Sequence, residues 1–226
     1  FYLNHRKSNK NSMQVAYRFN RINNDQLPYV VSLGFLAFFF ALGFSGLLDF
    51  MKYDPETAEN LTNLIVNPPL ILSILSVGIV APLYEEIIFR GSILKNLSGS
   101  MAVTMAVILQ AILFSAYHMN ILQAFPTLSL GLLTGFAVLY TNSIWSGIII
   151  HIINNILAIL ISNFTSETAT LNAFIFFALM LVALVAIIYT IIKLKRMRTP
   201  WHLLPDPMAP ITDIKLDELP ELHINN

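Results

Sequence analysis

Two adjacent carboxylates, Glu85 and Glu86, lie in an apolar stretch that ends at Arg90. Carboxylates are costly in hydrocarbon and persist there mainly in ion pairs or at functional sites. On a helix, Glu86 and Arg90 are four residues apart and share a face, whereas Glu85 is turned by about 100°. We therefore expect Arg90 to neutralise Glu86 and Glu85 to face an imidazole, as a general base would. The alternative is a helix end at the membrane surface, where Glu85 simply reaches water.

A histidine, His118, follows Phe114 by one helical turn in a second apolar stretch. Residues four apart on a helix share a face, so the phenyl ring should shield one side of the imidazole. A shielded imidazole can assist a general base. A histidine at the membrane surface is the alternative interpretation.

A third polar pair, His151 and Asn155, lies in another apolar stretch and again has helical spacing. An imidazole N–H beside an amide N–H forms a donor pair suited to an oxyanion. His151 falls near the middle of its apolar stretch, where a histidine without a role is least expected. The alternative is hydrogen bonding between helices, for which His and Asn are common in membranes.

The composition indicates a membrane protein. Of the 226 residues, 56% are hydrophobic and only 12% are charged, against about 25% charged in soluble domains. The 13 basic and 13 acidic residues balance, which gives no reason to expect a nucleic-acid partner. The absence of cysteine excludes disulfides, thiolate metal sites and a cysteine nucleophile. Because the chain begins with Phe1, we expect it to be a fragment from which an earlier apolar segment is missing.

The fold predicted from these stretches is all-α, a polytopic bundle of about six transmembrane helices. The predicted spans are 30–48, 69–90, 101–118, 122–141, 143–162 and 171–192. Short connectors between them favour antiparallel neighbours. We expect Pro82 to kink or open the second span, and Gly131 and Gly135 to mark a close contact between helices.

Charge orients the predicted bundle, because basic residues favour the cytoplasmic side. Basic residues precede the first predicted span and follow the second and sixth, whereas acidic residues dominate the opposite loops. Both ends are therefore predicted to be cytoplasmic. The expected organisation is a basic N-terminal segment (1–29), a transmembrane domain (30–198) with its motifs in 80–160, and a disordered, proline-rich tail (199–226).

Straight spans would leave Glu85 and His118 at different depths. Glu85 would lie towards the cytoplasmic side and His118 near the outer end of its helix, a gap on the order of 15 Å. Contact between them requires tilt, a broken helix or a displaced third span. We therefore predict that the second and third spans are not simple vertical rods.

The three motifs in this order, Glu-Glu-x-x-x-Arg, Phe-x-x-x-His and His-x-x-x-Asn, resemble the CPBP family of intramembrane endopeptidases. That family comprises the type II CAAX prenyl endopeptidases and bacteriocin-processing enzymes, also called Abi proteins. The resemblance covers roughly residues 80–160 and shows no departure at the motif positions. It implies hydrolysis of peptide bonds in membrane-associated, prenylated or bacteriocin-like peptides by a glutamate-activated water.

The resemblance also implies a role for each motif residue. Glu85 would match the base that activates water, and His118 would assist it. His151 and Asn155 would match the oxyanion-stabilising pair, and a supporting ion pair would be formed by Glu86 and Arg90. We favour chemistry without a metal or other cofactor, because no His-Glu-x-x-His motif is present. The alternative is Zn²⁺ held by Glu85, His118 and His151.

Two other classes of function stay open at this point. The chain could be a non-catalytic bacteriocin-immunity protein, or a small transporter with a Glu and His path. The transporter alternative is weakened by the absence of an inverted repeat and of a ring of like charges. In each case the expected partners are membrane lipid and a peptide or protein, and no oligomeric state is indicated. The expected location is a cell membrane, the bacterial plasma membrane in particular.

Overall fold

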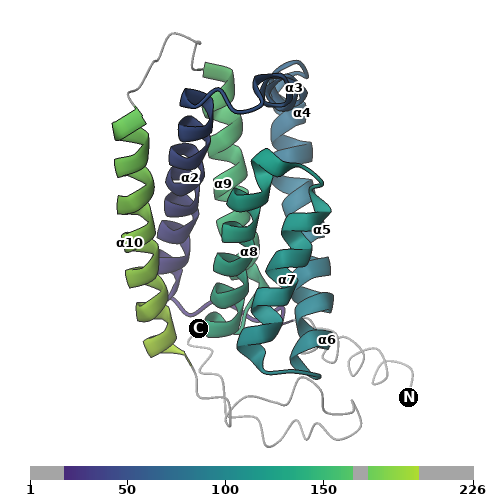
Figure 1. Cartoon of the computed structure of the whole chain (residues 1–226). Helices are drawn as coiled ribbons and strands as arrows, with labels where there is room; N and C mark the ends of the chain where they lie inside the picture. The colour runs from purple at the N-terminus through teal and green to yellow at the C-terminus, as the bar shows by residue number, and fades with distance from the viewer. Residues whose placement is uncertain (1–17, 165–172, 199–226) are drawn as a thin grey trace, which may run out of the picture.

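The computed structural model describes residues 18–164 and 173–198, and all regular elements within these ranges are helical (Figure 1). The predicted basic segment, 1–29, is thus described only from residue 18, and the predicted disordered tail, 199–226, lies outside the described residues. In chain order the elements are α2 (Leu27–Phe50), α3 (Pro55–Val66), α4 (Leu70–Ser73), η1 (Ile74–Val80), α5 (Ala81–Glu86), η2 (Ile87–Ile93), α6 (Leu94–Ser98), α7 (Val103–Tyr117), α8 (Ile121–Thr141), α9 (Ile144–Phe164) and α10 (Ala173–Met197).

Five helical stretches within the described residues are long and apolar enough to cross a membrane. They are Leu27–Leu48, Leu70–Ser98, Ile121–Thr141, Ile144–Phe164 and Phe174–Met197. They indicate a multi-pass membrane protein. The six predicted spans are not confirmed, because the third corresponds to α7, which has only 15 residues. A helix of that length is about 22 Å long, less than the roughly 30 Å of a hydrocarbon core.

The second predicted span, 69–90, was too short. Its helix runs without a break to Ser98, because the charge of Arg90 is buried within the bundle and does not end the span. The longer helix changes the depth of the glutamates. Glu85 follows Leu70 by fifteen residues and precedes Ser98 by thirteen, so it lies near the middle of the span.

This same helix contains two π-helical stretches, η1 and η2, on either side of α5. The backbone N–H of Ala81 bonds to the carbonyl of Ser76, five residues back, immediately before Pro82. Proline cannot donate a backbone hydrogen bond, and π-helical turns often accompany such irregularities. The prediction that Pro82 opens the second span is therefore confirmed, with a wider helical turn as the local form.

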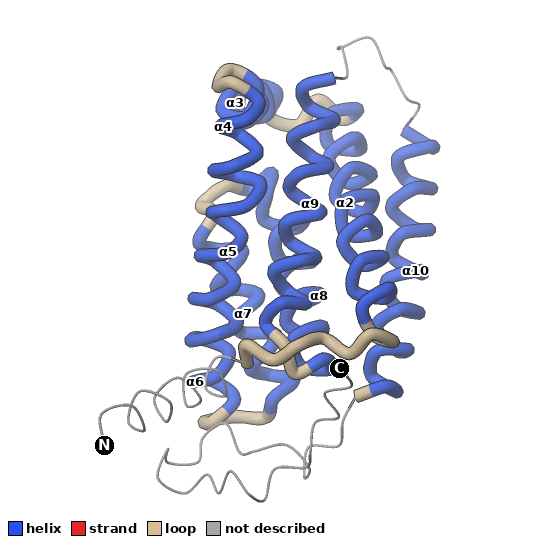
Figure 2. The backbone as a smooth tube through the Cα atoms, turned by 180° about the vertical axis from the view of Figure 1, so that it is seen from behind, coloured by secondary structure: helices blue, strands red, loops and turns tan. Residues whose placement is uncertain are grey.

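Helix α9 has the most neighbours in the bundle. It packs against α2, α8, α5 and η1, while α10 packs chiefly on α2 and α7 packs on α8 (Figures 1 and 2). The predicted glycine contact is confirmed between α7 and α8. A Cβ on Gly131 would lie 3.0 Å from the Cα of Ala111, and one on Gly135 would lie 3.0 Å from Val107 Cγ1.

Helix α7 is short and ends at mid-depth. In Figure 1 the α7–α8 hairpin stops well below the upper end of α9. The turn between the two helices is tight, because Met119 adopts a left-handed conformation (φ 47°) and the side chain of Asn120 accepts a hydrogen bond from the N–H of Leu122. His118, directly after α7, is therefore held inside the bundle rather than at its outer surface.

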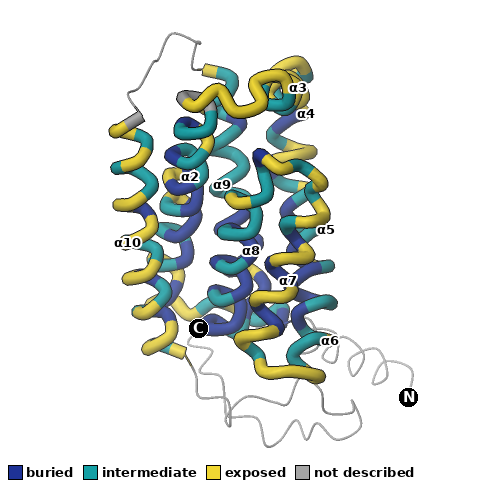
Figure 3. The backbone as a smooth tube through the Cα atoms, in the orientation of Figure 1, coloured by how far each residue is buried: buried dark blue, intermediate teal, exposed yellow. Residues whose placement is uncertain are grey.

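The burial pattern separates an inner core from outer faces (Figure 3). Helix α10 is exposed along much of its length, with only 11% of its most apolar window buried, and none of the α3 residues is buried. Five polar or charged residues are nevertheless buried near one another in the interior. They are Glu86, Arg90, Gln110, Thr134 and His151.

Among the described residues, basic side chains predominate at one end of the bundle and acidic ones at the other. Lys95 on α6 and the last turn of α10, with Lys195 and Arg196, lie at one end (Figure 1). The acidic helix α3, with Glu56 and Glu59, lies at the other. This arrangement agrees with the charge bias from which the orientation was predicted.

Candidate functional site

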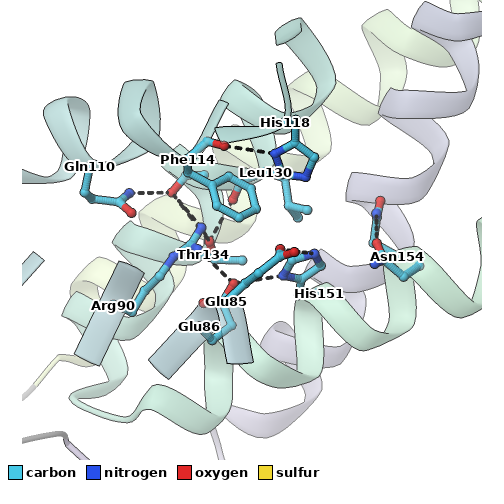
Figure 4. Close-up of polar contacts among 12 residues, drawn as sticks. Glu85, Glu86, Arg90, Gln110, Phe114, His118, Leu130, Thr134, His151 and Asn154 are labelled. Carbon is cyan, nitrogen blue, oxygen red and sulfur yellow. Dashed lines mark hydrogen bonds and ion pairs between the residues drawn. The ribbon is translucent and has the colours of Figure 1, made fainter. Parts of the chain in front are cut away.

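The two adjacent glutamates differ in environment (Figure 4). The Glu86 side chain is completely buried, and its Oε1 lies 2.9 Å from Nη1 of Arg90. The N–H bonds of that nitrogen are not aligned with the oxygen, so the contact is an ion pair rather than a hydrogen bond. The Glu85 side chain retains 15% of its surface and faces a cavity. The pairing expected from the four-residue spacing is thus present, and Glu85 is the carboxylate that a substrate or water can reach.

His151 lies between the two carboxylates. Its Nδ1 is 3.0 Å from Glu86 Oε1, and its Nε2 is 3.7 Å from Glu85 Oε2. From the sequence we expected only Arg90 as a partner of Glu86, so the contact of Glu86 with His151 was not predicted. A carboxylate can only accept, so Nδ1 carries a proton and the ring orientation is fixed. Nε2 is thereby directed towards Glu85 and the cavity.

His118 is also held through its Nδ1. Its Nδ1 lies 2.9 Å from the carbonyl oxygen of Phe114. A carbonyl oxygen accepts hydrogen bonds and cannot donate them, so Nδ1 is the protonated nitrogen. In the neutral ring, Nε2 then has a free lone pair. His118 lines the same cavity as Glu85 and can accept a hydrogen bond from a water molecule there.

Phe114 lies at the centre of the site. Its ring centroid is 4.9 Å from that of His118 and 5.7 Å from that of His151, and both contacts are edge-on. The guanidinium carbon of Arg90 lies 4.5 Å above the ring. The sequence predicted only that this ring would shield His118. In the structure the same ring also contacts His151 and the Arg90 guanidinium, so it packs against three of the polar groups of the site.

Asn155 lines the cavity but has existing partners. Its Nδ2 donates to the carbonyl of Val77 at 3.0 Å, and its Oδ1 accepts from Asn154 Nδ2 at 3.0 Å. An amide group has two N–H bonds. One of them is therefore engaged with the second span, and the other can donate to a substrate oxygen.

A polar layer behind Arg90 was missed by the sequence analysis. Arg90 Nη2 donates to Thr134 Oγ1, and Nη2 also lies 3.4 Å from the carbonyl of Gly131. The same carbonyl accepts from Gln110 Nε2 at 2.8 Å. A Gln or a Thr in an apolar helix is a weak signal in a sequence, because uncharged polar residues also occur there without a shared site. Here they fix the guanidinium that holds Glu86.

Gly147 is a second residue that the sequence analysis missed. It precedes His151 by one helical turn, and a Cβ there would overlap Oε2 of Glu86 and lie 3.1 Å from Val138 Cγ2. The Glu86 carboxylate therefore occupies the space that a larger residue would fill. The available signal was a glycine four residues before a buried histidine in an otherwise bulky, Ile-rich helix.

A cavity of about 640 Å³ brings the predicted catalytic residues together. Its polar lining includes Glu85, His118, His151, Asn154 and Asn155, whereas Glu86 and Arg90 are not part of it. The remaining walls are mainly aliphatic and aromatic side chains of α2, α8, α9 and α10. The depth gap expected for straight spans is removed by the mid-span position of Glu85 and the short α7. The prediction that the second span is not a simple rod is confirmed by its π-helical turns, whereas α7 is a regular α-helix that is short.

The alternative with a metal ion depends on how the His, Asp and Glu side chains are grouped in the site. Within the described ranges, no three His, Cys, Asp or Glu side chains are grouped so that they could hold one. Nδ1 of each histidine is engaged, by Phe114 or by Glu86, which leaves Nε2 as the nitrogen through which a histidine could bind a metal ion. The predicted alternative zinc ligands, Glu85, His118 and His151, share the cavity without forming such a group.

Comparison with known proteins agrees with the resemblance seen in the motifs. Residues 67–157 match the family model described as type II CAAX prenyl endopeptidase Rce1-like. All seven residues named in the three motifs lie within the matched segment. No match was found among curated proteins or among solved structures.

Proposed function

We propose that this chain is an intramembrane endopeptidase that hydrolyses a peptide bond with a water molecule activated by Glu85. The observation that carries the proposal is the meeting of Glu85, His118, His151 and Asn155 on one largely apolar cavity. The Rce1-like match over 67–157 supports a CAAX-type protease at the level of the family.

The proposed reaction is a single displacement. Glu85 takes a proton from water, while Nε2 of His118 accepts a hydrogen bond from the same water and orients it. The oxygen attacks the peptide carbonyl, whose electrons move onto its oxygen. That oxyanion receives hydrogen bonds from Asn155, through its remaining N–H, and from His151 Nε2, which donates when the ring is an imidazolium. The C–N bond then breaks, and Glu85 returns its proton to the leaving amine.

Glu86 and Arg90 have a supporting role in this proposal. Glu86 holds His151 through Nδ1, and Arg90 neutralises Glu86. Apolar surroundings strengthen such contacts relative to water. The Glu86 carboxylate is thus committed to orientation, which leaves Glu85 as the base.

The proposed substrate is a membrane-associated peptide, prenylated or bacteriocin-like. The apolar walls of the cavity suit an apolar peptide segment or an attached lipid chain. We also propose that the basic end of the bundle, with Lys95 and Lys195, faces the cytoplasm, as the charge bias favours.

The test is cleavage of a farnesylated reporter peptide with a C-terminal Cys-aliphatic-aliphatic-X sequence, alongside an unprenylated copy and an apolar bacteriocin-like peptide. Glu85→Gln, His118→Ala and His151→Ala should each reduce cleavage by at least about 100-fold, the usual contribution of general acid–base groups. Glu59→Gln on the exposed helix α3 is the matched control and should cleave normally. Normal cleavage by Glu85→Gln would overturn the assignment of the base.

Dependence on a metal is tested on the same purified protein. We expect cleavage to survive chelation and metal analysis to find no stoichiometric zinc. Stoichiometric zinc together with chelator-sensitive cleavage would replace this mechanism with a metal-assisted one.

A further inference from the structure

Pro82 leaves one backbone carbonyl of the second span without its usual donor. In the π-helical turn before it, the N–H of Ala81 bonds to the carbonyl of Ser76, five residues back. The next donor in this pattern would be the N–H of residue 82, and its acceptor would be the carbonyl of Val77. Proline has no N–H. The Val77 carbonyl is therefore free of the helical ladder.

A side chain from another helix takes the place of the missing donor. Nδ2 of Asn155, on α9, donates to the Val77 carbonyl at 3.0 Å. The Asn155 amide is itself held by Asn154, whose Nδ2 donates to Oδ1 at 3.0 Å. Within a membrane, a backbone carbonyl that has lost its helical donor is stabilised by such a partner.

We propose that Asn155 is a positioning residue that replaces the backbone donor lost at Pro82, in addition to any contact it makes with substrate. Pro82 precedes Glu85 by three residues, and Asn155 follows His151 by four. The hydrogen bond from Asn155 therefore joins the helical turn that precedes Glu85, the proposed base, to the helical turn that follows His151. It fixes η1, which leads directly into α5, against α9 and so sets the 3.7 Å separation of Glu85 Oε2 and His151 Nε2. The catalytic consequence rests on the proposed function, whereas the structural link does not.

A double-mutant cycle between Pro82 and Asn155 tests this link in the full chain. Pro82→Ala restores a backbone N–H for Val77. Asn155→Ala alone should lower the Tm of the detergent-solubilised protein by about 2–4 °C, the shift expected for one lost interaction in a chain of this size. In the Pro82→Ala background the same substitution should lower the Tm by less than half as much. Equal shifts in both backgrounds would overturn the proposal.

Asn163 provides a matched control on the same helix. Its Nδ2 donates to the carbonyl of Ile159 within α9, far from the proline. Asn163→Ala should therefore change the Tm by the same amount with or without Pro82. Coupling of Asn163 to Pro82 as strong as that of Asn155 would contradict a specific link.

An isosteric variant keeps the test decisive if Pro82→Ala does not fold. Asn155→Asp retains the size of the side chain but cannot donate from its carboxylate. It should lower the Tm at least as much as Asn155→Ala does. A Tm equal to that of the wild type would show that donation to Val77 is dispensable.

Cleavage kinetics separate positioning from direct contact with substrate. If Asn155 positions Glu85, Pro82→Ala should recover part of the kcat lost in Asn155→Ala, with little change in KM. An identical kcat loss in both backgrounds would assign Asn155 to the oxyanion alone. If none of the proteins cleaves any peptide, the proposed function fails, and the Tm cycle still decides whether the link exists.

Discussion

At the scale of single residues, the two neighbouring glutamates have different tasks. Glu86 is enclosed by Arg90 and His151, and Glu85 borders the cavity. Removing one partner of a buried ion pair leaves an uncompensated charge, which typically costs about 3–5 kcal/mol. We therefore expect a substitution of Glu86 to reduce mainly stability and a substitution of Glu85 to reduce mainly activity.

Substituting each glutamate by glutamine tests this separation. Glu86→Gln should lower stability by about 3–5 kcal/mol, because Arg90 loses its counter-charge. Glu85→Gln should abolish cleavage and leave stability nearly unchanged. Thermal unfolding and cleavage assays on both variants provide the comparison, and equal losses of stability would contradict the assignment.

Gly147 allows a more local test of the Glu86 pocket. Gly147→Ala places a methyl group against the Glu86 carboxylate, and overpacking of this kind costs about 1–3 kcal/mol. We expect that loss of stability together with at least tenfold slower cleavage. Gly78→Ala is the matched control, since its Cβ would meet the side chains of Ile156 and Ile159 at 3.1 and 3.3 Å. It should slow cleavage much less.

The ionisable members of the site were predictable because each stands out in apolar sequence. Glu85, His118 and His151 were identified in this way. Gly147 and Thr134 were not, because neither carries a charge and their roles depend on what packs against them. The contact between Glu86 and His151 was also missed, since a helical pattern describes neighbours on one helix and not those on another.

At the scale of elements, the turn after α7 determines where His118 lies. Met119 has a φ of 47°, a conformation that costs a residue other than glycine about 1 kcal/mol or more. Met119→Gly should therefore raise stability by up to about 1 kcal/mol and preserve cleavage. Met119→Val, which is β-branched, should lower both. Thermal unfolding and the reporter assay check this pair, and a Val variant as stable as the Gly variant would contradict it.

Hydropathy predicted the positions of the helices well, but it did not predict the pattern of backbone hydrogen bonds within them. The expected spans 122–141 and 143–162 differ from α8 and α9 by at most two residues at each end. The π-helical turns were not predictable in detail, because hydropathy does not distinguish hydrogen bonds four residues apart from those five apart. Only Pro82 indicated an irregular backbone. The predicted span 101–118 exceeded α7 by two residues at its start and one at its end, and the error was to expect so short a helix to cross the membrane.

At the scale of the whole molecule, the proposed orientation places α6 and α3 on opposite sides of the membrane. The chain contains no cysteine, so single cysteines can be introduced without background. Ser98→Cys should react with an impermeant maleimide only after the cytoplasmic side is opened. Glu59→Cys should react in intact cells. The reverse pattern would invert the proposed orientation.

The mid-span position of Glu85 has an electrical consequence. A unit charge carried from either surface to that depth crosses about half of the membrane, which corresponds to about 1 kcal/mol at 100 mV. In the proposed hydrolysis, the proton that Glu85 takes from water returns to the leaving amine, so a turnover transfers no net charge across the bilayer. Cleavage in proteoliposomes should then proceed without a current and be little affected by a potassium diffusion potential, whereas an ion path through Glu85 would be driven by it.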